Sequence, residues 1–240
     1  MVAPGRLVGT GRNADVYDIG DGRVLRQYRD GRPPRAVARE AEVMAHARAY
    51  GAPVPEVYDV SGPDIVMERA AGPTMLDTLG RRPWTVRAQA RLLARLHAAV
   101  HAVPALDWLP APFDGEGGAP TAPAPAVLLH RDLHPQNVIL TGGGPMIIDW
   151  EGAARGPAAA DIAMTWVIIV FSEVPGPRMR AVAARPVQGL FGGSFLRAAG
   201  HADLRWLEMS VRHRIGDRNL LPSELARLER LQRTGRYPGR

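Results

Sequence analysis

One stretch, residues 130–151, constrains the fold of this chain more than any other. It has the sequence HRDLHPQNVILTGGGPMIIDWE. Two short apolar runs within it, 138–140 and 146–148, contain β-branched residues and are separated by glycines, which predicts a β-hairpin. The hairpin would bring Asp149, directly after the second run, back beside Asn137, directly before the first.

Three oxygen-bearing side chains lie at fixed intervals in this stretch. Asp132 and Asn137 are separated by four residues, on a loop that Pro135 keeps from forming regular helix. A carboxylate such as Asp132 can accept a proton, while the amide oxygen of Asn137 and the carboxylate of Asp149 can hold magnesium. Magnesium is a hard ion that prefers oxygen ligands. The pattern therefore indicates metal-assisted chemistry.

The same residues resemble the catalytic loop and metal-binding segment of the protein-kinase-like superfamily. The resemblance is closest to its aminoglycoside and choline phosphotransferase branch, where His follows the loop's Asp-Leu and Asp-Trp/Phe-Glu replaces Asp-Phe-Gly. It implies an α+β, protein-kinase-like two-lobe fold. We expect residues 1–70 to form a nucleotide-binding lobe, a small antiparallel sheet with one helix. Residues 71–240 would form a larger, mainly helical lobe that binds the acceptor.

The resemblance also assigns roles to residues of the stretch. Asp132 is expected to be the catalytic base, and Asn137 and Asp149 the magnesium ligands. Glu151 would be an additional or water-mediated ligand of the same ion. His130 is expected to support the loop.

A second match lies near the N-terminus, in the sequence GTGRNADVY of residues 9–17. It resembles the loop that covers the nucleotide in the same superfamily. Gly9 and Gly11 would let backbone amides come close to phosphate oxygens. Because no helix follows directly, neither a Rossmann fingerprint nor a Walker loop fits.

The kinase fold needs a cation on the following strand, 23–29, and the usual residue is lysine. This chain has no lysine, so all 30 of its basic residues are arginine. We assign the role to Arg26, whose guanidinium can bind phosphate with two nitrogens. Arg23 and Arg29 are alternatives on the opposite face. By resemblance, Glu40 on the next helix pairs with the strand cation.

The hinge between the lobes is expected at residues 67–70, where the Glu68 carbonyl and the Ala70 amide would meet the adenine. Asp161 is expected to begin an apolar helix and to accept backbone hydrogen bonds from the catalytic loop. His97 and His101 are interpreted as packing or capping residues. The proline-rich segment 104–125 is expected to be a loop. Helical spacing predicts helices at 35–50, 74–79, 85–103, 162–171, 178–199, 202–215 and 223–232.

Composition narrows the remaining possibilities. The chain has no cysteine, which excludes disulfides and thiolate chemistry. Neither a signal-peptide core nor a membrane-spanning run is visible, so we expect a cytoplasmic protein without a membrane partner. From residue 178 onward there are 13 Arg and 5 acidic residues. Basic and aromatic residues do not alternate there, so we interpret the excess as solvated helix faces and do not expect nucleic-acid binding.

These features favour an ATP- and Mg²⁺-dependent kinase that moves the γ-phosphate to a hydroxyl of a small molecule. A non-catalytic nucleotide-binding pseudokinase is the alternative, favoured by the missing lysine. A protein kinase is disfavoured by Asp-Trp-Glu and by the lack of an Ala-Pro-Glu segment. The basic C-terminal third disfavours a polycationic acceptor. A choline-like acceptor would need an aromatic cage, with Trp166, Phe171 and Trp206 as candidates.

Overall fold

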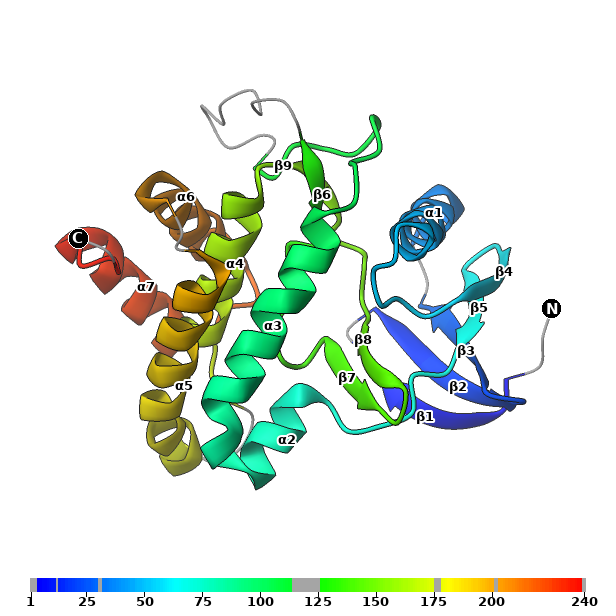
Figure 1. Ribbon diagram of the computed structural model, residues 1–240, viewed down its shortest axis with the longest axis horizontal. Coiled ribbons are helices and arrows are strands. Elements are labelled where there is room, and N and C mark those ends of the chain that lie inside the picture. The colour runs from blue at the N-terminus through cyan, green and yellow to red at the C-terminus, as the bar shows by residue number, and fades with distance from the viewer. Residues whose placement is uncertain are drawn as a thin grey trace.

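The computed structural model describes residues 4–11, 13–29, 32–113, 126–174, 178–200 and 203–238. It has the expected α+β, kinase-like two-lobe fold. Figure 1 shows a small sheet lobe carrying the N-terminus beside a larger lobe built mainly of helices.

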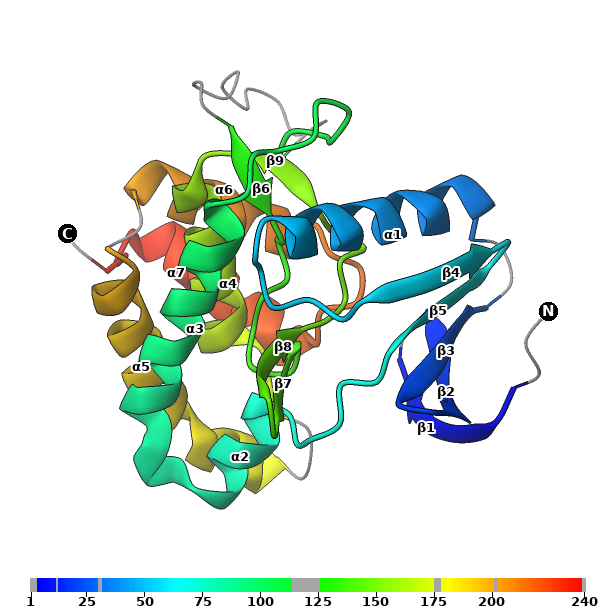
Figure 2. The same ribbon diagram turned by 45° about the vertical axis from the view of Figure 1, so that its right-hand side comes forward.

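The sheet lobe contains five antiparallel strands in the order β1-β2-β3-β5-β4, with one helix, α1, against the sheet. Figure 2 shows α1 running alongside β4 and β5. The turn between β2 and β3 has Asp21 and Gly22 at φ 52° and 68°, the left-handed pair that a tight hairpin requires. The bounds are β1 Arg6–Thr10, β2 Ala14–Gly20, β3 Arg23–Tyr28, α1 Pro34–Ala49, β4 Val57–Ser61 and β5 Asp64–Glu68.

Helix α1 confirms the helix expected at 35–50. Pro34 stands at its first turn, where proline is tolerated because the missing N–H would have no partner there. Its buried residues recur at helical spacing and face the sheet; they are Val37, Glu40, Ala41, Val43, Met44 and Ala47. Glu40 is the only charged member of that buried set.

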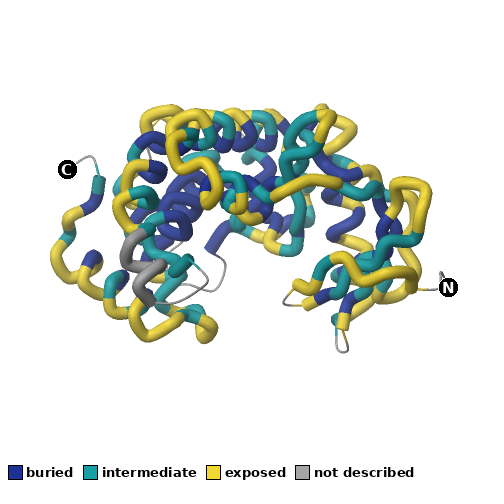
Figure 3. The backbone as a smooth tube through the Cα atoms, turned by 90° about the horizontal axis from the view of Figure 1, so that it is seen from below, coloured by how far each residue is buried: buried dark blue, intermediate teal, exposed yellow. Residues whose placement is uncertain are grey.

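The second lobe is organised around α3 and α4. Helix α3 packs against α5, and α4 packs against α5 and α6. In Figure 3 most of the buried chain lies within the helical lobe, and shorter buried stretches lie in the sheet lobe. The bounds are α2 Met75–Arg81, a 3₁₀ turn Pro83–Thr85, α3 Val86–His101, α4 Ala158–Phe171, α5 Arg178–Ala199, α6 Leu204–Ile215 and α7 Pro222–Thr234. No helix in the described ranges has the length and apolar character to cross a membrane.

Two short strand pairs complete this lobe. β7 (Val138–Thr141) and β8 (Gly144–Ile147) form the predicted hairpin. Beyond it, the Ile148 amide donates to the Asn137 carbonyl at 3.0 Å, so the chain brings residue 149 back beside Asn137. β6 (Val127–Leu129) pairs with β9 (Ala154–Gly156), and β9 was not expected.

One boundary differs from expectation. Asp161 does not begin its helix: α4 begins at Ala158, after Pro157 in extended conformation, and Asp161 lies in the first turn. Helix α7 is capped by Glu224, whose carboxylate accepts the Leu221 amide at 3.1 Å. Residues 114–125 of the proline-rich segment lie outside the described residues. Its first part, 104–113, forms no helix and contacts α1, where Trp108 Nε1 donates to Glu42 at 3.2 Å.

Candidate active site

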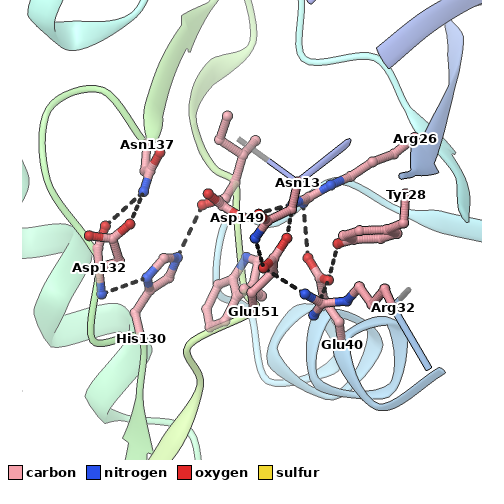
Figure 4. Close-up of polar contacts among 12 residues, drawn as sticks. Asn13, Arg26, Tyr28, Arg32, Glu40, His130, Asp132, Asn137, Asp149 and Glu151 are labelled. Atoms are coloured by element: carbon pink, nitrogen blue, oxygen red, sulfur yellow. Dashed lines mark hydrogen bonds and ion pairs between the residues drawn. The ribbon is translucent and has the colours of Figure 1, made fainter. Parts of the chain in front are cut away.

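Arg26 connects the two lobes. It lies on β3 with its side chain 11% exposed, and its Nη1 donates to Glu40 Oε1 at 2.9 Å. Its Nη2 donates to Asp149 Oδ1 at 2.8 Å and to Glu151 Oε1 at 2.9 Å. Figure 4 shows the guanidinium reaching all three carboxylates. The planar fork of arginine makes this possible, because its nitrogens donate in several directions at once.

Burial governs the electrostatics around Arg26. Burial tends to lower the pKa of its guanidinium, but the charges of Glu40 and Asp149 outweigh this and raise that pKa. Burial raises the pKa of Glu40, and Arg26 and the Tyr28 hydroxyl oppose the rise. Tyr28 donates to Glu40, and burial followed by the neighbouring Glu40 charge raises the pKa of its phenol. The cation is thus held by a buried acid, the pairing that the sequence predicted.

Two further side chains join this cluster that sequence reasoning missed. Asn13 Nδ2 donates to Glu151 Oε2 at 2.9 Å, and Arg32 Nη1 donates to the same oxygen at 2.7 Å. Arg32 Nη2 also lies 3.5 Å from Glu40 Oε2, and its guanidinium stacks over the Tyr28 ring at 4.4 Å. Both come from turn or loop segments without periodicity. The only signal was their place beside the glycine-rich turn and the cationic strand.

Asp132 and Asn137 form a second group on the loop 130–137, which the sequence predicts to be the catalytic loop. Asn137 Nδ2 donates to the Asp132 carbonyl oxygen at 2.8 Å and to Asp132 Oδ2 at 3.1 Å. His134 Nε2 lies 3.5 Å from Asp132 Oδ1. Burial tends to raise the pKa of Asp132, but His134 and then His130 and Asn137 lower it overall. The carboxylate is 46% exposed and therefore accessible to a second molecule.

His130 holds the loop in place. The Asp132 amide donates to His130 Nδ1 at 3.3 Å, so the ring proton is on Nε2, which donates to the Ile148 carbonyl at 3.1 Å. The ring is fully buried and packs on Trp150 at 4.6 Å. Burial lowers the pKa of His130. A neutral histidine thus ties the catalytic loop to the segment that carries Asp149.

Two residues of the site adopt a left-handed backbone that side chains disfavour. Arg131 has φ 67° and Asp149 has φ 69°. Such a conformation costs roughly 1 kcal/mol for a non-glycine residue. The Arg131 amide donates to Asp161 Oδ1 at 2.7 Å and the His130 amide donates to Asp161 Oδ2 at 3.1 Å. Asp161 therefore braces the loop as the sequence predicted, although it does not begin its helix.

Asp161 is itself fully buried beside two histidines. His101 Nε2 lies 3.0 Å from its Oδ2, and His97 Nδ1 lies 3.5 Å from the same oxygen. Burial tends to raise the pKa of Asp161, but these histidines hold it well below its ordinary value. Burial lowers the pKa of His97.

The donor set beside Asp149 suits magnesium. Among the described residues, no hydrogen bond uses Asn137 Oδ1 or Asp149 Oδ2, so both oxygens can take a ligand. Glu151 differs, because both of its oxygens accept from Asn13, Arg26 or Arg32. Asn137 and Asp149 therefore offer hard oxygen donors without rearrangement, whereas Glu151 would first have to release its partners.

The remaining predicted residues lie in the sheet lobe or at its edge. Gly9 is in β1, and the Gly11 amide donates to the Ala14 carbonyl at 2.8 Å within the turn to β2. Glu68 ends β5, and its carboxylate accepts from Arg48 at 3.3 Å. Ala70 follows it on the linker. The structure brings none of these four into the Arg26 cluster, and their contacts with a nucleotide stay predictions.

The aromatic candidates for an acceptor cage do not form one. Trp166 packs against Phe171, whose ring is covered by the Arg227 guanidinium at 5.2 Å. Trp206 packs against Phe113 and carries the Arg205 guanidinium at 4.8 Å. Rings that already carry guanidinium ions are poor sites for another cation.

A surface pocket of about 480 Å³ lies at the end of α6. None of the predicted nucleotide-binding residues belongs to it. The Arg131 Nη2 atom lies 3.1 Å from His213 Nε2 and so connects the pocket to the catalytic loop. Its lining residues are His213, Arg214, Gly216, Asp217, Arg218 and Asn219.

Comparison with known proteins agrees with this architecture. A sequence profile of the phosphotransferase enzyme family matches residues 5–122 and 116–207. A choline/ethanolamine kinase family protein from Mesorhizobium loti has a similar structure, with TM-score 0.61 and 17% identity, covering 98% of this chain and 89% of that one. The aminoglycoside phosphotransferase APH(4)-Ia gives TM-score 0.66 and 16% identity over 95% and 93% of the two chains. Plasmodium vivax ethanolamine kinase gives 0.57 and 14% over 97% and 81%.

One match to a curated protein is short. The thiamine kinase of Salmonella paratyphi B is 46% identical over 39 residues, which is 16% of this chain and 14% of the length of that relative.

Proposed function

Because the chain belongs to the phosphotransferase enzyme family, we propose that it transfers the γ-phosphate of ATP to a hydroxyl group of a small molecule. The observation that carries this proposal is the position of Arg26. It links buried Glu40 to Asp149 and Glu151 next to the Asp132–Asn137 pair. Phosphoryl transfer asks a protein mainly for positioning and charge stabilisation, and these residues supply both.

In this proposal the nucleotide lies between the lobes, residues 1–70 on one side and residues 71–240 on the other. The adenine meets the Glu68 carbonyl and the Ala70 amide. The amides near Gly9 and Gly11 cover the phosphates. These contacts use backbone groups, so they depend on the path of the chain more than on side-chain identity.

Arg26 grips the phosphates. Without nucleotide its Nη2 donates to Asp149 and Glu151. A triphosphate takes over these donors, because phosphate oxygens bind a guanidinium fork with two hydrogen bonds. The ion pair between Arg26 and Glu40 is buried, with side chains 11% and 1% exposed, so it stays in place and keeps the guanidinium directed toward the site. The Asp149 carboxylate would then be free of Arg26 and could serve as a metal ligand.

Asn137 Oδ1 and the Asp149 carboxylate would hold magnesium, and Glu151 would contribute directly or through water. Bound there, the ion would neutralise negative charge on the phosphates. Arg32 and Asn13 retain Glu151 near this position through its Oε2 atom. The pairing of Asp149 with Arg26 before nucleotide binding holds its strained backbone in the orientation that it needs.

Asp132 orients the acceptor hydroxyl and takes its proton. The acceptor oxygen bonds to the γ-phosphorus, the bond from that phosphorus to the bridging oxygen breaks, and ADP leaves. The lowered pKa keeps Asp132 ionised at neutral pH, so the carboxylate can accept the proton as the hydroxyl attacks. Asn137 holds Oδ2 at 3.1 Å, which fixes the direction of the carboxylate.

The acceptor itself is a small molecule that is not a polycation. The pocket that Arg131 joins to the catalytic loop contains two arginines and a histidine against one aspartate. Of the three rings that could have caged a quaternary ammonium, Phe171 and Trp206 already carry guanidinium ions, and Trp166 packs against Phe171. The thiamine kinase match covers too little of that relative to choose a substrate.

One observation favours a second candidate function, a nucleotide-binding module without catalysis. Arg26 stands in place of the usual lysine and occupies both Asp149 and Glu151 with one nitrogen. An arginine that never releases these acids would leave a fold that binds nucleotide but does not transfer phosphate. Turnover separates the two candidates.

The test is ADP release with pools of hydroxylated metabolites and antibiotics, in parallel with titration of a non-hydrolysable ATP analogue. The Asp132→Asn variant should lose about 10²–10⁴-fold in turnover while its affinity for the analogue changes little. Asp59→Asn, at an exposed position on β4, is the matched control and should keep both. Loss of nucleotide binding in Asp132→Asn would make the residue structural. A wild-type protein that binds nucleotide but releases no ADP with any pool would favour the second candidate.

A further inference from the structure

A buried cluster behind the catalytic loop combines two histidines and an aspartate. His97 and His101 lie four residues apart on α3, so they share one face of the helix, and Asp161 faces them from α4. His97 Nδ1, His101 Nε2 and a carboxylate oxygen of Asp161 all lie within 4.8 Å of one another. In the described part of the chain, no other three His, Asp or Glu side chains come this close together. Their side chains are only 1%, 9% and 0% exposed.

The hydrogen bonds of this cluster leave one lone pair without a donor. His97 Nε2 lies 3.3 Å from the Leu133 carbonyl oxygen, which can only accept, so the ring proton is on Nε2. His97 Nδ1 therefore carries a lone pair. It makes no hydrogen bond in the described structure, and it points at Asp161 Oδ2 from 3.5 Å. Two acceptors that face each other in a buried place repel unless a proton on Nδ1 or a metal ion lies between them.

The spacing of the three atoms suits a tetrahedral ion. Zinc binds histidine nitrogen and carboxylate oxygen at about 2.0–2.2 Å, which places neighbouring tetrahedral ligands about 3.3–3.5 Å apart. Asp161 Oδ2 is 3.0 Å from His101 Nε2 and 3.5 Å from His97 Nδ1. The two histidine nitrogens lie within 4.8 Å of each other, so the imidazole rings would have to close on the ion to complete the geometry.

The surroundings have the outer contacts that metal ligands need. A ligating histidine normally donates its other N–H to a carbonyl, as His97 does to Leu133. Asp161 uses Oδ1 to accept the Arg131 amide at 2.7 Å, which fixes the orientation of the carboxylate. Two imidazoles and one carboxylate favour zinc over magnesium, which takes oxygen ligands.

We propose that His97 Nδ1, His101 Nε2 and Asp161 Oδ2 form a binding site for a divalent cation of the zinc type, with water as the fourth ligand. His101, the least buried of the three, gives the route of entry. Binding ties the end of α3 to the start of α4. Because Asp161 also accepts the His130 and Arg131 amides, it ties both helices to the catalytic loop. The site is separate from the magnesium site and does not depend on the proposed function.

Binding has a defined proton balance. His101 Nε2 gives up its proton to become a ligand, and the neutral ring then carries its proton on Nδ1.

The experiment uses untagged full-length protein freed of metal with a chelator. Zinc is titrated against a chromophoric competitor, and cobalt(II) is added separately as a spectroscopic probe of tetrahedral coordination. Wild-type protein should bind one zinc ion per chain and give the intense visible absorption of tetrahedral cobalt. His101→Gln should weaken zinc binding by at least about 100-fold, because loss of an outer contact alone costs 10–100-fold.

Two control variants show whether zinc binds at this cluster or elsewhere on the chain. His46→Gln changes a histidine on α1 whose Nε2 contacts the Pro104 carbonyl, and it should keep zinc affinity. Asp149→Asn should also keep it, because that residue belongs to the proposed magnesium site. Wild-type protein without stoichiometric zinc binding would overturn the proposal, as would zinc binding that survives in both His97→Gln and His101→Gln. If His97→Gln does not fold, the cobalt spectrum of wild-type protein and the zinc affinity of His101→Gln still test the proposal.

Discussion

Arg26 offers the sharpest test of how the two lobes are joined. Replacing it with methionine keeps most of the side-chain volume but leaves Glu40 as a buried charge without its main partner. Glu40 is 1% exposed and Arg26 11%. Breaking a buried ion pair by removing one partner costs about 3–5 kcal/mol.

The structure places the expected value at the lower end of that range. Arg32 lies 3.5 Å from Glu40 and Tyr28 still donates to it, so the carboxylate keeps some compensation. The Asp149 side chain is 40% exposed and can be hydrated when Arg26 is removed, so loss of the Arg26–Asp149 ion pair contributes little. We therefore expect about 3 kcal/mol of destabilisation. For a chain of this size that corresponds to a fall in Tm of about 6–12 °C.

The assay is thermal unfolding without nucleotide, with Arg23→Met as the matched control on the same strand. Arg23 is 44% exposed and its partner Asp21 85%, so the control should melt within about 2 °C of wild type. Arg26→Lys should fall between, because one ammonium keeps the charge but loses the fork that spans Glu40 and Asp149. Equal Tm values for the Arg26→Met and Arg23→Met variants would refute the reasoning.

Other predictions concern packing and pH. Gly192→Ala would place a Cβ 2.7 Å from Val170 Cγ2, between α5 and α4, and should destabilise by about 1–3 kcal/mol. Gly189→Ala on the same helix meets nothing within 4 Å and should stabilise by up to about 1 kcal/mol; equal shifts of Tm in both variants would contradict this. Burial lowers the pKa of His97 and His130 in the folded chain. At pH values between these lowered pKa values and about 6.5, the unfolded chain therefore binds more protons than the folded chain. With a metal chelator in the buffer, Tm should therefore fall as pH drops below about 6.5. A Tm that stays constant from pH 8 to 5 would contradict this prediction.

The β7–β8 hairpin could be predicted because local pattern and tertiary structure agree there. Two apolar runs around glycines form β7 and β8, and Ile148 returns to Asn137. Arg26 could be chosen from three arginines because strand alternation puts it on the face of Tyr28, and that face meets Glu40. Regular elements with a clear period thus carry their side chains to predictable places.

The parts that could not be predicted depend on contacts between distant segments. Asn13 and Arg32 come from aperiodic turns and find Glu151 only once the lobes are in place. Strand β9, Ala-Arg-Gly, has little intrinsic strand preference and is extended because it pairs with β6. Asp161 has the chemistry of a helix cap, but Pro157 starts α4 earlier and leaves the carboxylate to the catalytic loop. In each case a contact with a distant segment determines the local structure or the side-chain partner.

The central claim is that Asn137 and Asp149 hold magnesium at the end of a nucleotide whose phosphates Arg26 grips. Titration of a non-hydrolysable ATP analogue with and without magnesium tests it most directly. We expect magnesium to strengthen binding at least about 10-fold in wild-type protein and to have little effect in Asp149→Asn. Equal affinity with and without magnesium in wild-type protein, or an unchanged magnesium effect in Asp149→Asn, would contradict the claim.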